Sequence, residues 1–302
     1  MNETKPKYLI LGANGLIGQH VVRLCREKHI PYEGTCYSRS SGEFISFNQL
    51  DFEKIPALLE RVSPTVVFNA IGLAGGVNFC EENPELGRQY HVQATQVMAD
   101  WCRAHHAVFV YISTDYVFDG ENPPYKEDDP THPLNLYGQF KLEGENYIRQ
   151  HLDHYIIART TNVFGWDPET RTPNFLMHLV QTLRENDSID SIRVPAYLYG
   201  NPTCAADLAA AIMDLIAHHH FGLYHIVGPG YINRYDWALK FIEMAGITNK
   251  TIEKLETPPV NMVPRPLKSN LDTSKFSRAS GFRLRSIEDG LQLFINDMNH
   301  RK

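Results

Sequence analysis

Short apolar runs alternate with amphipathic segments along the first half of the chain. Such runs, bounded by turn residues, are typical of buried strands, and they lie at residues 8–11, 32–37, 65–68, 108–112 and 155–158. Between them, apolar residues recur every three or four positions, as in helices that bury one face, at residues 16–26, 52–62, 84–105 and 136–149. This alternation predicts an α/β protein with a parallel sheet that is covered by helices on both faces.

The pattern weakens after about residue 165. We expect helices at 174–184, 206–217, 235–245 and 287–298, strands at 191–194 and 223–227, and an extended proline-rich stretch near 258–266. No fixed-period repeat and no linker divides the chain. The prediction is therefore a doubly wound first domain over residues 1–165, followed by a smaller mixed α/β part over residues 166–302 whose segments interleave with the first domain.

Composition and charge narrow the class of protein. The chain has 302 residues, 43% hydrophobic and 21% charged, with a net charge of −6, which excludes a disordered chain and argues against nucleic-acid binding. No apolar run reaches the roughly 20 residues that span a membrane, and the polar N-terminus is unlike a signal peptide. The five scattered cysteines indicate reduced thiols in a cytoplasmic protein. Three adjacent histidines, residues 218–220, point in different directions on a helix, so we expect no metal.

A glycine-rich turn connects the first predicted strand to the first helix. Glycines allow a tight turn, close approach of the backbone to a pyrophosphate, and close packing of the helix on the strand. The helix N-terminus adds free N–H groups for the phosphates. We therefore predict dinucleotide binding by residues 1–165, a Rossmann-type domain, although a plain strand–helix turn is the alternative. The predicted contacts are Gly12, Asn14, Gly15, Leu16, Ile17 and Gly18.

The end of the second strand bears on the choice of cofactor. Folds specific for NAD usually place a carboxylate there to bind the ribose 2′-hydroxyl, and residues 36–40 contain none. Arg39 can instead pair with a 2′-phosphate, and Ser38 can donate a hydrogen bond. We therefore predict NADPH as the preferred cofactor, with NADH also usable. The alternative is that Arg39 is an ordinary solvated loop residue.

Tyr137 and Lys141 are four residues apart on one predicted helix, so their side chains share a face. A free phenol titrates near pH 10, and a nearby cation favours the phenolate, which brings the group towards a useful range for acid–base catalysis. Ser113 and Thr114 follow the fourth strand, at the sheet edge where α/β proteins bind ligands. They are placed to hydrogen-bond a substrate oxygen, although they could equally cap the strand.

These motifs resemble the extended short-chain dehydrogenase/reductases, and in particular the dTDP-4-dehydrorhamnose reductase family. The segments that carry the resemblance follow the same order in this chain: GxxGxxG at 12–18, NAxG at 69–72, residues 77–85, 111–120, 137–145 and 200–209, and Arg265 with residues 266–272. The resemblance implies reduction, with NADPH or NADH, of the C4 keto group of a nucleotide-linked 4-keto-6-deoxy sugar. The implied pathway is the biosynthesis of deoxysugars and surface polysaccharides.

The resemblance also implies roles for individual residues. Tyr137 would donate the proton, Lys141 would tune it and bind the nicotinamide ribose, and Thr114 would hold the reacting carbonyl. Further cofactor contacts would come from residues that follow the second and third strands, namely Asp51, Phe52, Asn69, Ala70 and Gly72. Substrate contacts would come from Ser113, Thr114, Tyr116, Phe118, Asn162 and Arg265. The expected partner is the nucleotide sugar, and a homodimer is left open.

Two positions depart from the family pattern. His91 stands where these enzymes usually carry asparagine, and Asn162 stands where they usually carry a tryptophan beside the sugar. Tyr116 disfavours a 4,6-dehydratase, which would need a carboxylate directly after Thr114-Asp115. Two other functions remain open: a sugar-nucleotide epimerase, which shares the Tyr–Lys pair, and a non-catalytic regulatory subunit like that of methionine adenosyltransferase.

Overall fold

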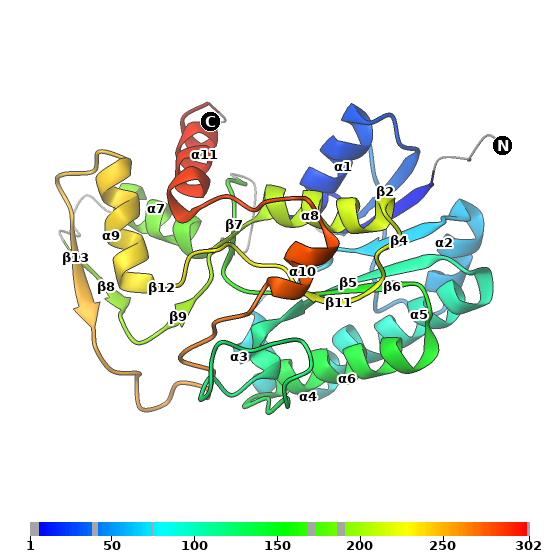
Figure 1. Cartoon of the computed structure of the whole chain (residues 1–302), viewed down its shortest axis with the longest axis horizontal. Coiled ribbons are helices and arrows are strands. Elements are labelled where there is room, and N and C mark those ends of the chain that lie inside the picture. The colour runs from blue at the N-terminus through cyan, green and yellow to red at the C-terminus, as the bar shows by residue number, and fades with distance from the viewer. Residues whose placement is uncertain (1–5, 38–41, 74, 168–172, 186–190, 301–302) are drawn as a thin grey trace.

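A parallel sheet of seven strands forms the centre of the computed structural model, which describes residues 6–37, 42–73, 75–167, 173–185 and 191–300 (Figure 1). Its order is β11-β6-β5-β4-β1-β2-β3, and every neighbouring pair is parallel. The strands are β1 (Tyr8–Leu11), β2 (Tyr32–Cys36), β3 (Ile45–Ser46), β4 (Val66–Asn69), β5 (Val108–Thr114), β6 (Tyr155–Thr160) and β11 (Gly222–His225). The predicted Rossmann-type α/β fold is confirmed.

Helices cover both faces of this sheet, because β1, β4, β5 and β6 carry apolar side chains towards each side. One face packs against α1 (Gly18–Glu27), α8 (Ala205–Ala217) and α10 (Ser274–Ala279), with Val21, Ile212 and Phe276 fully buried there. The other face packs against α2 (Lys54–Val62), α5 (Ala94–His105) and α6 (Leu136–His151). The sheet is thus the middle of three layers.

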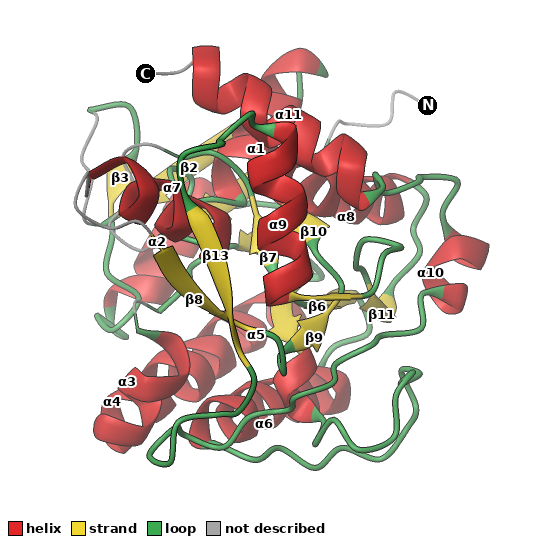
Figure 2. Ribbon diagram, turned by 90° about the vertical axis from the view of Figure 1, so that its left-hand side faces the viewer, coloured by secondary structure: helices red, strands yellow, loops and turns green. Residues whose placement is uncertain are grey.

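The C-terminal part has a core of its own at one end of the molecule (Figures 1 and 2). It contains α7 (Phe175–Glu185), α9 (Arg234–Met244), α11 (Ile287–His300) and the parallel pair β8 (Ser191–Pro195) and β13 (Thr251–Leu255), which pack around Trp237, Phe241 and Phe294. The chain also returns to the central sheet after residue 166, since α8 packs on α1 and β11 pairs with β6.

The long helix expected over residues 84–105 is interrupted. It consists of α4 (Pro84–Arg88), a π-helical turn (Gln89–Gln93) and α5, and α3 (Gly76–Glu82), which the apolar pattern did not indicate, precedes it. Such π turns often occur at functional sites. The pattern also missed β13 and the short strands β3, β7 (Val163–Phe164), β9 (Tyr199–Gly200), β10 (Thr203–Cys204) and β12 (Ile232–Asn233). Two-residue strands form through tertiary pairing and leave no periodic signal.

Candidate active site

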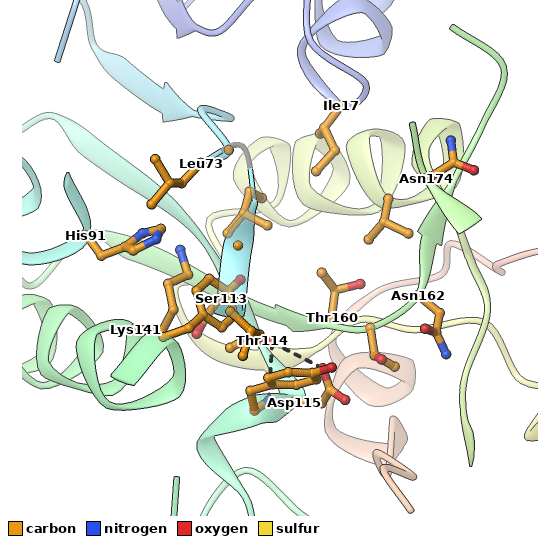
Figure 3. A pocket seen from close by; sticks show the side chains of 18 of the residues that line it. Ile17, Leu73, His91, Ser113, Thr114, Asp115, Lys141, Thr160, Asn162 and Asn174 are labelled. Atoms are coloured by element: carbon orange, nitrogen blue, oxygen red, sulfur yellow. Dashed lines mark hydrogen bonds between the residues drawn. The ribbon is translucent and has the colours of Figure 1, made fainter. Parts of the chain in front are cut away.

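A cavity of about 400 Å³ opens at the carboxyl ends of β4, β5 and β6, between the two parts of the chain. In Figure 3, Ile17 and Leu73 border it on one side and Thr114 and Asp115 on the other, while His91 and Lys141 face Asn162 and Asn174 across it. Several residues predicted from the sequence line this one cavity: Ile17, Ala70, Gly72, Ser113, Thr114, Tyr116, Tyr137, Lys141 and Asn162.

The glycine turn shapes the end of the cavity next to α1. Gly12 has φ +77°, in the left-handed region that favours glycine, and Gly15 N–H donates to the Gly12 carbonyl (2.9 Å). A Cβ at Gly18 would lie 2.1 Å from the Gly12 oxygen, so only glycine lets α1 begin this close to the turn. This narrow turn, with a helix N-terminus behind it, fits the pyrophosphate of a dinucleotide.

The loop after β4 lies beside the glycine turn. Asn69 fixes the loop, because its Oδ1 accepts from Ile71 N–H (3.1 Å), while Ala70 N–H donates to the Leu11 carbonyl (3.0 Å). The Gly72 carbonyl accepts from the Tyr90 hydroxyl (3.1 Å). The two loops lie against each other, since a Cβ at Gly12 would lie 3.2 Å from the Ala70 carbonyl oxygen, and Ile17, Ala70, Ile71 and Gly72 line the same cavity.

Three contacts place Tyr137 at the cavity. Asn135 caps α6, since its side chain accepts from Gly138 N–H (2.9 Å), and Glu81 accepts from Leu136 N–H (2.7 Å). A Cβ at Gly138 would lie 2.2 Å from the Tyr116 carbonyl oxygen, so glycine lets α6 touch the segment that follows β5. The Tyr137 ring consequently stands edge-on to the rings of Tyr116 (5.9 Å between centroids) and His91 (5.3 Å).

The electrostatics of Tyr137 differ from the simple expectation for a Tyr–Lys pair. Burial, and then the nearby Asp115, raise the pKa of Tyr137 well above its usual value, while a hydrogen bond with Thr114 acts in the opposite direction. Burial lowers the pKa of Lys141 to about 8, although Glu145 and Cys80 counter it. Lys141 Nζ lies 4.1 Å from the centroid of the Tyr111 ring. The free chain therefore holds Tyr137 as a neutral phenol, which is the form that can donate a proton.

Thr114 and Ser113 at the end of β5 have different surroundings. The Thr114 hydroxyl donates to Asp115 Oδ1 (3.1 Å) and accepts from Tyr116 N–H (3.2 Å), at the cavity wall. The Ser113 hydroxyl donates to Glu145 Oε1 (2.5 Å), deep in the protein, and Glu145 is fully buried. Of the two hydroxyls predicted to contact substrate, Thr114 is the one held beside Tyr137.

The other predicted substrate contacts are spread out. Tyr116 lines the cavity, whereas Phe118 is fully buried in the core, stacked on Tyr125 with centroids 4.1 Å apart, and is not part of the cavity wall. Arg265 lies outside the wall but hydrogen-bonds Tyr116, and its guanidinium also donates to Asn78 Oδ1 (3.2 Å). Arg265 thus reaches the cavity through Tyr116.

Asn162 occupies a special backbone position on the cavity wall. Its φ is +47°, in the left-handed region, where asparagine is tolerated better than most residues. Gly200 leaves room for its amide, because a Cβ there would lie 2.5 Å from Asn162 Nδ2. The conformation explains why asparagine suits this position where the family usually carries tryptophan.

Asn162→Val is expected to lower the free energy of unfolding by about 1–2 kcal/mol, because a β-branched side chain is disfavoured at positive φ. Asn162→Gly, the control, removes the same amide without adding strain and is expected to be nearly neutral. Urea unfolding of both variants measures the difference. Equal losses would assign the stability to the amide contacts instead of to the backbone.

The remaining predicted cofactor contacts lie away from the cavity or outside the described residues. Asp51, which precedes α2, pairs with Lys54 at the surface (2.8 Å), and Phe52 packs against the core. Neither is part of the cavity wall. Ser38 and Arg39 fall in residues 38–41, outside the described part of the chain.

The cavity is also lined by residues that were not among the predicted contacts, including His91, Asp115, Phe175 and Arg234. His91 is buried on the π-helical turn, and burial and then Lys141 hold its pKa well below 6.5, so it is neutral. The motif STDY contains Asp115, and the departure at position 91 had already singled out His91. Arg234 and Phe175 belong to no recognised motif, and tertiary packing brings them to the cavity.

The model of the RmlD substrate binding domain family matches residues 6–300 of this chain. The chain belongs to this family. It is 30% identical to methionine adenosyltransferase 2 subunit beta of Xenopus laevis, over 97% of this chain and 90% of that protein. It is 29% identical to the spore coat polysaccharide biosynthesis protein SpsK of Bacillus subtilis, over 96% and 97% of the two chains.

The fold is shared with dTDP-4-dehydrorhamnose reductase of Bacillus anthracis, whose structure was solved in complex with NADP. The TM-score is 0.84 at 23% identity, and the match covers 98% of this chain and 100% of that one. The match to the family model confirms the RmlD-type family predicted from the motifs. Relatives of the RmlD type thus include oxidoreductases.

None of the helices described combines the length and the apolar character needed to cross a membrane. Across the described residues, no group of three or more His, Cys, Asp or Glu side chains is arranged to hold a metal ion.

Proposed function

We propose that this RmlD-type protein uses NADPH to reduce the C4 keto group of a nucleotide-linked 4-keto-6-deoxy sugar, as dTDP-4-dehydrorhamnose reductases do, in the biosynthesis of a surface polysaccharide. The observation that carries the proposal is the meeting of Thr114, Tyr137 and Lys141 on one cavity, which the glycine-turn loops border. The polysaccharide pathway named for SpsK and the NADP held by a protein of the same fold support it.

The side chains of the site divide the chemistry between them. When bound, NADPH would supply the hydride for C4. Tyr137, held as a neutral phenol, donates its proton to the carbonyl oxygen, so that C=O becomes CH–OH. In this proposal Lys141, on the same helix, binds the nicotinamide ribose and stabilises the phenolate that remains. Thr114 hydrogen-bonds the carbonyl oxygen once substrate replaces its bond to Asp115.

The test is to incubate the purified chain with NADPH or NADH and a panel of dTDP- and UDP-linked 4-keto-6-deoxy sugars. Loss of absorbance at the nicotinamide band, with formation of the 4-hydroxy sugar, is the expected result. An epimerase would change the sugar without net consumption of cofactor, so product analysis separates these two functions.

Arg39→Ala is expected to lower kcat/KM with NADPH about tenfold or more and to leave NADH nearly unaffected. The reason is that a charge-assisted contact to the 2′-phosphate contributes roughly 1.5–3 kcal/mol. Steady-state kinetics of both proteins with both cofactors measure it. Equal losses with the two cofactors, or a wild-type preference for NADH, would remove Arg39 from the 2′-phosphate site.

A regulatory role is the second candidate, favoured by the 30% identity to methionine adenosyltransferase 2 subunit beta. A regulatory subunit would bind its partner enzyme and would need no turnover at Tyr137. Mixing the chain with a methionine adenosyltransferase and measuring that enzyme's activity tests this role. A change in that activity, together with no reduction of any 4-keto sugar, would favour it over the reductase.

A further inference from the structure

Arg234 is the first residue of α9 and lines the cavity. The proposed reaction gives it no role. Its backbone N–H donates to the Leu198 carbonyl (3.0 Å). The helix start is satisfied without its side chain, because Asn233 accepts from Asp236 N–H (2.7 Å) and donates to the Asp236 carboxylate (2.7 Å). The Arg234 guanidinium is therefore not needed to begin the helix.

This charge is also unfavourably placed for the fold. The N-terminus of a helix carries a partial positive charge, so a cation in the first turn is repelled. Among the residues that the structure describes, no carboxylate lies within 4 Å of the Arg234 guanidinium to offset this. The nearest acidic residue of the same turn, Asp236, is bonded to Asn233. A costly cation that has no carboxylate partner among the described residues points to an anionic ligand.

The guanidinium is held at the cavity wall by an aromatic ring. Arg234 Cζ lies 5.3 Å from the centroid of the Phe175 ring, and Phe175 lines the same cavity. The Phe175 ring in turn packs against the fully buried Trp237 ring, with centroids 5.2 Å apart. This cation–π contact fixes one face of the guanidinium and leaves its N–H donors for a planar or tetrahedral anion.

The guanidinium of Arg265 acts on the same residue of the cavity wall as Arg234, namely Tyr116. Burial and Asp115 raise the pKa of Tyr116, and Arg234 and Arg265 both act to lower it, Arg265 also through a hydrogen bond. Two cations from different segments therefore converge on one phenol. Asp115, a carboxylate on the cavity wall, is buried and accepts from Thr114. Two positive charges that act on one residue of the cavity wall favour a bound anion nearby.

We propose that Arg234 is a substrate-recognition residue that pairs with an anionic group of the nucleotide sugar. Nucleotide sugars offer two kinds of anionic group. The nucleoside diphosphate sugars used here all carry a pyrophosphate, and some also carry a carboxylate on the sugar ring. The inference rests on the nucleotide-sugar substrate class of the proposed function, but not on the reduction step. Arg234 thereby adds a second cation, from α9, to the substrate side of the cavity.

The experiment is calorimetric titration of the full chain, in the presence of NADP, with UDP, UDP-glucose and UDP-glucuronate. The proteins are the wild type, Arg234→Gln and Arg234→Lys. Arg193→Gln is the matched control, because Arg193 is exposed in the same part of the chain and, among the described residues, pairs with the exposed Glu253 (3.5 Å). Thermal melting of each variant runs alongside, and Arg234→Gln is expected to melt no lower than the wild type, since it removes a repelled cation.

We expect Arg234→Gln to weaken binding at least about tenfold, and Arg234→Lys to restore part of it because lysine keeps the charge but lacks the planar fork. A loss common to all three ligands assigns the pyrophosphate, whereas a loss confined to UDP-glucuronate assigns the sugar carboxylate. Unchanged binding of every ligand by Arg234→Gln would overturn the inference, as would a wild type that binds none of them. Because no turnover is measured, a chain that binds these ligands through Arg234 but reduces no keto sugar would contradict only the proposed reaction.

Discussion

Tyr137→Phe is expected to lower kcat by about 10² to 10⁴ while leaving the affinity for NADPH nearly unchanged. The phenol contributes only as the carbonyl oxygen gains negative charge, so its loss affects the transition state more than the ground state. In the free chain, burial and Asp115 keep Tyr137 protonated, and the ring carries no contact that phenylalanine would lose except those of its hydroxyl. Steady-state kinetics and a fluorescence titration with NADPH measure the two quantities.

Tyr147→Phe is the matched control. Tyr147 lies on the same helix, α6, and donates to Asp100 Oδ1 (2.8 Å) far from the cavity lining. Its loss should leave kcat unchanged. If Tyr137→Phe also kept near-wild-type turnover, Tyr137 would not be the proton donor, and the regulatory role would gain support. Loss of thermal stability alone in Tyr137→Phe would indicate a packing role.

The fold was predictable because local signals agreed with one another. Apolar runs, helical periodicity and the glycines at 12 and 18 all specify strand, turn and helix in the order of a parallel sheet. Beyond residue 166 the same signals are weaker, and β11 joins the central sheet by pairing with β6. The short strands β7, β9, β10 and β12 were not predictable, since each exists only through a partner distant in sequence.

Only those site residues that belong to recognised motifs were predictable from the sequence. Spacing places Tyr137 and Lys141 on one helix face, but it cannot show that burial dominates the pKa of both groups, raising that of the phenol and lowering that of the amine to about 8. It cannot show that Phe118, within the recognised motif, is turned into the core. Arg234 belongs to no motif and meets the cavity through the packing of α9 on Phe175. Burial and long-range contacts are properties of the folded chain.

Arg159→Met is expected to cost about 3–5 kcal/mol of the free energy of unfolding, because it leaves a buried carboxylate without its cation. Arg159 on β6 and Glu145 on α6 are both fully buried, and Nη2 lies 2.7 Å from Oε2. A second guanidinium nitrogen donates to the Glu127 carbonyl (3.2 Å), so several partners lose a bond together. Chemical denaturation measures the loss. Arg193→Ala breaks an exposed pair and should cost less than about 1 kcal/mol.

The double variant Arg159→Met, Glu145→Leu tests whether the loss of stability comes from the unpaired charge of Glu145. If the single variant is unstable because Glu145 is left charged and unpaired, removing the carboxylate as well should restore much of the stability, since buried pairs often contribute little over apolar replacements. Activity gives the second readout. Glu145 raises the pKa of Lys141 and accepts from Ser113, which precedes Thr114, so the double variant should hold Lys141 charged over a narrower pH range. As the pH rises, the rate of a stable double variant should begin to fall at a lower pH than the rate of the wild type. That result would link this buried pair to the candidate site. An unchanged pH profile would confine the pair to folding.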